Sequence, residues 1–264
     1  ADDGGAGGVC EETSLVFRQA SRDVDLLFVI DNSGSMASEQ ARLNQQLDVL
    51  MQALNNLQGG FPNAHIGIVS TDLGAGPYTT YCDVGGDFGR LQDTPRVANC
   101  APPGDPYIAI ENGNGVLSGN IANVDTPTED GLDCQGLTNG SGSPIPADDD
   151  QALDVCDIQA AFACIASLGI NGCGFEQPLE SARLALTCDQ ETCTNPNFLR
   201  DSAVLVIVFL GDEDDCSARR GDLYNPAQTG LMSELGPPTS YRCFEFGVTC
   251  DQAIGRTGDQ TLTG

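Results

Sequence analysis

Three stretches of the chain consist almost entirely of aliphatic and β-branched residues. They cover residues 24–30 (VDLLFVI), 65–71 (HIGIVST) and 203–210 (AVLVIVFL). A strand with one exposed face alternates apolar with polar residues, whereas these runs are nearly continuous. Continuous runs are typical of parallel strands that are covered on both faces. The pattern therefore predicts three buried strands of one sheet.

An amphipathic helix is expected between the first two strands, within residues 37–58. Its apolar residues recur at spacings of three and four, and Gly59 and Gly60 end the stripe. The stripe consists of Leu43, Leu47, Leu50, Met51, Leu54 and Leu57. Two more helices are expected before the third strand, one within residues 155–168 and one that begins at Pro178. Strands that alternate with helices predict an α/β fold, with an open, Rossmann-like, mainly parallel central sheet flanked by helices.

The other segments differ in composition from this α/β unit. Residues 1–21 begin with a Gly- and Asp-rich stretch, and we expect them to be flexible. Residues 74–150 are rich in Gly, Pro, Asn and Asp, and we interpret them as a long, disulfide-stapled insertion in a domain that covers residues 22–216. Residues 217–264 form an irregular extension that contains cysteines.

The charge of the chain excludes several classes of partner. It has 38 acidic and 11 basic residues, for a formal net charge of −27. A nucleic acid or an anionic membrane surface would be repelled. No apolar run approaches the roughly 20 residues needed to span a bilayer. The excess of carboxylates favours cations, although solubility or adaptation to salt would also explain it.

The cysteines and the histidine narrow the chemistry further. The chain has 12 Cys and one His, so a Cys/His zinc site is disfavoured and disulfides are expected. Disulfides indicate an oxidising compartment, and we expect a secreted, periplasmic or cell-surface protein. Cys188 with Cys193, and Cys243 with Cys250, are the pairs that could close small loops. The single His65 lies at the start of an expected strand, which favours a structural role, and we expect no enzymatic activity.

The strongest local motif follows the first strand directly. It reads Asp31-Asn32-Ser33-Gly34-Ser35 and precedes the first helix. One carboxylate and two hydroxyls in a tight turn suit a hard divalent cation such as Mg²⁺ or Ca²⁺. Parallel α/β sheets also bind ligands beyond the C-terminal ends of their strands. The alternative is an ordinary turn in which Ser35 or Ser38 caps the helix.

The run VDLLFVIDNSGSM, followed by a helix and then by HIGIVSTD, resembles the von Willebrand factor type A (VWA) domain. In that family a metal-ion-dependent adhesion site begins with D-x-S-x-S, and two later loops add a Thr and an Asp. Asp212, after the third strand, matches the family's Asp. The resemblance covers residues 22–72 and 155–216 and implies a cysteine-rich, secreted VWA-like domain. The family sheet usually continues with two more strands, whereas residues 217–264 show none, so we expect a domain that is truncated or is completed by another chain or a missing segment.

The second loop departs from the family pattern. Residues 172–177 (GCGFEQ) contain no Thr, and either Phe175 or Glu176 falls near its position. Glu176 would replace a hydroxyl with a carboxylate and raise the affinity for a cation, or else it only stabilises the N-terminus of the following helix. Possible rim residues are Asp72, which could equally be a turn residue, Asp214 and Asp215.

These observations predict a metal-dependent adhesion module. Its divalent cation would be held by Asp31, Ser33, Ser35, Asp212 and Glu176, and would coordinate an acidic or other oxygen ligand from a protein or a glycan. The alternative is a structural surface or filament subunit that self-assembles and whose binding site is vestigial.

Overall fold

The computed structural model describes residues 22–80, 82, 85–95, 101–122, 153–188, 192–218, 221–230, 233–237, 240–247, 249–250 and 262–263. The expected N-terminal segment 1–21 lies outside the described residues, as do residues 123–152. The fold is α/β, with a central five-stranded sheet in the order β4-β3-β2-β1-β5. Its strands are β1 (Asp23–Ile30), β2 (Asn63–Ser70), β3 (Ile108–Gly113), β4 (Val116–Gly119) and β5 (Val204–Leu210).

The three strands expected from the sequence form one half of this sheet. β1 lies between β2 and β5 and runs parallel to both, which confirms the expected arrangement. β3 and β4 are antiparallel, so the sheet is mixed, and the expectation of a mainly parallel sheet is wrong for this half. The tight turn at Asn114 and Gly115, which both have positive φ, accounts for the pairing of β3 with β4, because so short a connection can only join antiparallel strands. β3 also runs antiparallel to β2, to which it is joined by a long connection.

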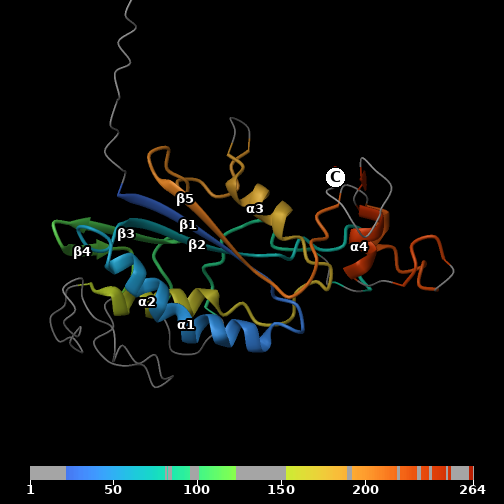
Figure 1. Ribbon diagram of the computed structural model, residues 1–264, viewed down its shortest axis with the longest axis horizontal. Coiled ribbons are helices and arrows are strands. Elements are labelled where there is room, and N and C mark those ends of the chain that lie inside the picture. Colours follow the sequence, from blue (N-terminus) through green and yellow to red (C-terminus); the bar gives the residue numbers. More distant parts are fainter. Residues whose placement is uncertain are drawn as a thin grey trace, which may run out of the picture.

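Helices cover both faces of the sheet (Figure 1). They are α1 (Ala37–Asn55) and α2 (Val155–Ala166) on one face and α3 (Pro178–Leu186) on the other. α1 ends slightly before the expected boundary, and Leu57 is half exposed beyond it. α2 begins with a capping box, in which Asp154 accepts from the backbone of Asp157 and Asp157 reciprocates. In the described part of the chain, no helix combines the length and apolar character that crossing a membrane requires.

A small second core lies at the end of the molecule toward which β1, β2 and β5 run (Figure 1). It contains the short helices η1 (Gly221–Tyr224) and α4 (Ser240–Gly247). Two disulfides cross this core, Cys82–Cys173 and Cys216–Cys243. We refer to it as the disulfide core. The remaining short strands, β6 (Thr249–Cys250) and β7 (Leu262–Thr263), pair with each other.

The expected oxidation of the cysteines is confirmed for eight of them. Disulfide-bonded cysteines are Cys82, Cys156, Cys164, Cys173, Cys188, Cys193, Cys216 and Cys243. The local pair Cys188–Cys193 is present as expected. The guess that Cys243 pairs with Cys250 is wrong, because α4 packs Cys243 into the disulfide core against Cys216. Disulfides are typical of oxidising compartments.

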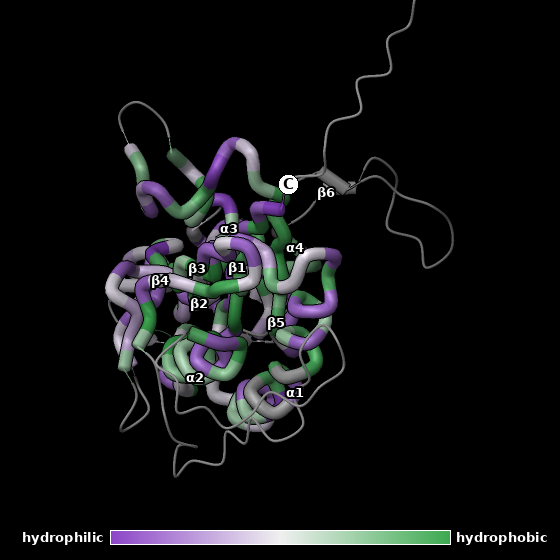
Figure 2. Tube along the Cα trace, turned by 90° about the vertical axis from the view of Figure 1, so that its left-hand side faces the viewer, coloured by the Kyte–Doolittle hydropathy of each residue, from purple (hydrophilic) through white to green (hydrophobic). Residues whose placement is uncertain are grey.

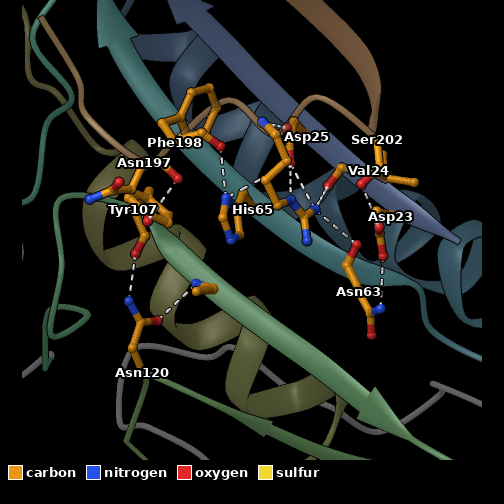
Figure 3. A network of polar contacts seen from close by, with 12 residues as sticks. Asp23, Val24, Asp25, Asn63, His65, Tyr107, Asn120, Asn197, Phe198 and Ser202 are labelled. Carbon is orange, nitrogen blue, oxygen red and sulfur yellow. Dashed lines mark hydrogen bonds and ion pairs between the residues drawn. The ribbon is translucent and has the colours of Figure 1, made fainter. Parts of the chain in front are cut away.

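A network of hydrogen bonds and ion pairs connects the strands at the opposite end of the sheet, where β1 and β2 begin (Figure 3). The carboxylate of Asp25 is fully buried and accepts from the Nε and the backbone N–H of Arg200, at 2.8 and 2.7 Å. Arg200 also donates to the carbonyls of Val24 and Asn63. His65 contributes a ring nitrogen 2.7 Å from the Phe198 carbonyl. The network joins β1, β2 and the chain that leads into β5.

Candidate metal-binding site

The turn that follows β1 gathers its oxygen atoms as the motif predicts. Asp31 is 1% exposed, and the backbone N–H of Ser33 donates to its Oδ1 at 2.7 Å. The hydroxyl oxygens of Ser33 and Ser35 lie 3.2 Å apart. The side chain of Gln40 holds the turn in place, since its Nε2 donates both to the Asp31 carbonyl and to the Gly169 carbonyl after α2.

The loop after β5 brings Asp212 to this turn. β5 pairs with β1, and the N–H of Asp31 donates to the Leu210 carbonyl at 2.8 Å. The hydroxyl of Ser35 then donates to Asp212 Oδ1 at 3.1 Å. Burial, and to a lesser degree the charge of Asp212, raises the pKa of Asp31, while bonds from Ser33 oppose that rise. Asp31 and Asp212, the two acids of the predicted site that are farthest apart in the sequence, are thus close together in the structure.

The second loop adds Glu176 rather than Phe175. Glu176 is 2% exposed, and its Oε2 accepts from the hydroxyl of Thr71 at the end of β2. Burial raises the pKa of Glu176 to about 9, and the nearby charge of Asp31 adds to the rise, while the Thr71 bond opposes it. Phe175 points into the disulfide core, with its ring centroid 5.0 Å from that of Tyr224.

A glycine and a disulfide explain why this loop approaches so closely. The N–H of Gly172 donates to the Asn32 carbonyl, and a Cβ at position 172 would lie 2.2 Å from the Asn32 side-chain oxygen. Any larger residue there would have to displace the buried side chain of Asn32. The next residue, Cys173, is fixed by its disulfide to Cys82. Glu176 is therefore held against the Asp31 turn from two directions.

Two buried carboxyl oxygens at this site accept no hydrogen bond from any other group of the described residues, although a proton on Glu176 bonds it to Asp31. They are Asp31 Oδ2 and Glu176 Oε1. Both residues line a cavity of about 140 Å³, together with Thr71, Pro178, Phe209, Leu210, Gly211 and Glu213. A water molecule occupies roughly 30 Å³ in the liquid, so the cavity has room for an ion with a few waters. Two ionised carboxylates so close together in a buried site would be costly, and either a proton shared between them or a divalent cation would remove that cost.

None of the three possible rim residues, Asp72, Asp214 and Asp215, lines the cavity. Asp72 accepts from the N–H of Gly74 within its own turn. Asp215 accepts from the N–H of Leu179 at the start of α3 and from Ser217. Asp214 is exposed on the same loop. Asp72 therefore stabilises its own turn, which was the alternative role considered for it, and Asp215 caps the start of α3.

Two side chains that line the cavity, Thr71 and Glu213, were not predicted from the sequence. Thr71 supplies a hydroxyl, which was hidden because it reads as the last residue of an apolar strand. Glu213 lines the cavity, and burial together with Asp31, Asp212 and Asp214 raises its pKa. Its position directly after Asp212 was the available signal.

No known protein family, curated protein or solved structure matches the chain. The described residues also contain no compact group of three or more His, Cys, Asp or Glu side chains of the kind that holds a metal by itself.

Proposed function

We propose that the chain is a VWA-like, divalent-cation-dependent binding module. Asp31 and Glu176, which line the cavity, would hold the ion, with Thr71 beside them. Ser33, Ser35 and Asp212 are linked by hydrogen bonds next to Asp31 but are not among the cavity-lining residues, and they would complete the coordination from that side. The observation that carries the proposal is the pair of buried carboxyl groups of Asp31 and Glu176, which line one cavity and whose Oδ2 and Oε1 atoms accept no bond from any other group of the described residues.

A cation in this cavity would balance charges that otherwise repel. The hydroxyls of Ser33, Ser35 and Thr71 are neutral, so they supply oxygen atoms without adding to the negative charge. A coordination position on the open side of the cavity would accept an oxygen atom of a protein or glycan ligand. The disulfides support a setting in an oxidising compartment, and we propose a secreted, periplasmic or cell-surface location.

Calorimetric titration of the chelator-treated protein with CaCl₂ and MgCl₂ tests the cation site. We expect saturable binding to the parent and a large loss in Asp212→Ala. Asp214→Ala is the matched control, because this exposed acid lies two residues further along the same loop, whereas Asp212 accepts the hydrogen bond from Ser35 of the Asp31 turn. Equal losses in both variants would reveal diffuse counter-ion binding to an acidic surface and would overturn the proposal.

The adhesive function has its own test. Arrays of glycans and of secreted proteins should be probed with the parent in calcium, in magnesium and in EDTA. We expect ligands that are retained with one of the cations and released by EDTA and by Asp212→Ala. Binding that survives both treatments would show that the cation site is not the ligand site.

A further inference from the structure

Asn114 and Gly115 form the two-residue turn that joins β3 to β4. Both residues are exposed, and their φ angles are 59° and 92°. Asn-Gly is a preferred sequence for such a turn, because both residues tolerate the left-handed conformation. β4 is an edge strand of the sheet and lies at the side of the molecule (Figure 2). The turn is therefore open to water on the outside of the fold.

An Asn-Gly step also contains a reactive pair of groups. The backbone nitrogen of the glycine attacks Cγ of the asparagine and closes a succinimide ring. The N–Cγ bond forms, the bond from Cγ to Nδ2 breaks, and the amide proton of the glycine leaves with that nitrogen as ammonia. Water then opens the ring at either carbonyl and leaves an aspartate or an isoaspartate. Glycine favours the attack because it has no Cβ to obstruct it.

The chain has several Asn-Gly steps, so their surroundings decide which of them reacts. They begin at Asn112, Asn114, Asn139 and Asn171. Asn139 lies outside the described residues. The other three differ in how firmly the side-chain amide and the attacking nitrogen are held.

Asn112 is protected by its hydrogen bonds. Its Nδ2 donates to the Phe61 carbonyl at 2.7 Å, which fixes the amide group that would have to leave. Its Oδ1 accepts from the N–H of Gly115 at 2.7 Å. Gly113, which would supply the attacking nitrogen, is paired with Val116 in the ladder between β3 and β4. Both reacting groups of this step are therefore held in place.

Asn171 is protected by the close packing of the loop that carries Glu176. The N–H of Gly172 donates to the Asn32 carbonyl at 2.8 Å. Gly172 also lies against the buried side chain of Asn32, where even an added Cβ would overlap with it. The nitrogen of Gly172 must break this bond and displace that side chain before it can attack Asn171.

Asn114 has the fewest restraints of the three. Its side chain makes no hydrogen bond to another group of the described residues. The space around Gly115 is open, since a Cβ there would meet no atom within 4 Å. The N–H of Gly115 is restrained by the bond to Asn112 Oδ1, which is exposed, and exposed hydrogen bonds are readily exchanged for bonds to water.

We propose that Asn114 is a site of spontaneous deamidation, and that the fold directs this modification to Asn114 and away from Asn112 and Asn171. An isoaspartate at position 114 adds a methylene group to the backbone of a two-residue turn, so β4 loses its register with β3 at the turn. Leu117 of β4 packs against the main core and pairs with Leu153 just before α2, so the loosening reaches the start of that helix. This modification goes beyond the cation site and does not require a cation.

Peptide mapping by mass spectrometry, after incubation under mildly alkaline conditions, tests the choice of site. In the folded protein Asn114 should be lost at least about tenfold faster than Asn112 or Asn171, because their restraints must first be broken. In the reduced chain in guanidinium chloride, the three rates should agree within about threefold, because each residue precedes a glycine. Equal rates in the folded protein would overturn the proposal, as would an intact Asn114 after the unfolded chain has been converted.

Asn114→Gly is the matched variant for the structural consequence, because glycine keeps the positive φ and has no side-chain amide. Hydrogen exchange before and after incubation should show that the amides of β4 lose protection in the parent and keep it in this variant. Asn114→Asp adds the charge without the methylene group, and without incubation it should protect β4 as the parent does. Unchanged protection in a parent that carries isoaspartate at position 114 would overturn the proposed loosening of β4.

Discussion

Asp25 and Asp31 are six residues apart on one strand and its following turn, and both side chains are fully buried, yet they face opposite surroundings. Asp25 meets a guanidinium, a backbone N–H and a histidine ring, so both its oxygens are matched within the chain. Asp31 accepts one backbone N–H and otherwise meets carboxyl groups, and apart from the proton of Glu176 no described group donates to its Oδ2.

The difference separates a structural carboxylate from a candidate ligand. Arg200 supplies the positive charge that balances Asp25, so the buried carboxylate at that end of the sheet needs no ligand from solution. At the other end Asp31, Glu176 and Glu213 line the cavity and Asp212 lies next to the Asp31 turn, and the cavity residues include no basic side chain. The positive charge must then come from protons or from a cation in solution.

The largest effect is expected for Asp25→Asn. The substitution leaves the guanidinium of Arg200 without its carboxylate in a mostly buried position, which should lower the free energy of unfolding by about 3–5 kcal/mol. Urea unfolding in EDTA measures the change. Asp23→Asn, at the less buried start of β1, is the control and should cost clearly less. Equal unfolding midpoints for parent and Asp25→Asn would contradict the structural role.

Asp31→Ala should behave in the opposite way. We expect the affinity for Mg²⁺ or Ca²⁺ to fall roughly 100-fold or more, since a ligand is lost. Stability in EDTA should stay the same or increase, because one member of a repelling group is removed. Calorimetry measures the first effect and thermal unfolding the second. Parent-like cation affinity in this variant would leave Asp31 as only a turn residue.

Glu176 predicts a pH dependence in the absence of cations. Its folded pKa of about 9 lies above the ordinary value of 4.5, so between these values the folded protein holds a proton that the unfolded chain releases. The free energy of unfolding should therefore fall as pH rises through this window. Urea midpoints in EDTA from about pH 5 to about pH 9 should show a shallower decline in Glu176→Gln. Identical slopes would show that the carboxyl group is not protonated in the folded protein.

The smallest effects are expected for the hydroxyls. Ser33→Ala and Ser35→Ala each remove a neutral donor atom, and cation affinity should drop by roughly three- to tenfold. Ser38→Ala is the control, because this exposed hydroxyl bonds to Glu39 outside the cavity. Losses as large as in Asp31→Ala would mean that the hydroxyls, rather than the carboxylates, dominate binding.

The sequence predicted best what depends on local pattern. Continuous apolar runs placed β1, β2 and β5, and Pro178 marked the start of α3. β3 and β4 were missed as sheet strands because they are short and only half buried, so they resemble the loops around them. The pairing of Cys243 could not be read from spacing, since it depends on how a distant helix packs.

The candidate site shows the same limit. Asp31, Ser33 and Ser35 follow one another on a single turn, so their convergence is local and visible in the motif. Thr71 reaches the site only because β2 lies beside β1, and its role is a result of the tertiary fold.

The pairing of β1 with β5 has a consequence for the rates of folding. Val24 pairs with Val204, so two distant parts of the chain must meet before the Asp31 turn and Asp212 face each other. Closing so long a loop costs entropy before the contacts are gained, and such contacts tend to form late. A cation bound between these loops would then change the folding rate little, and it would stabilise the protein mainly by lowering the unfolding rate.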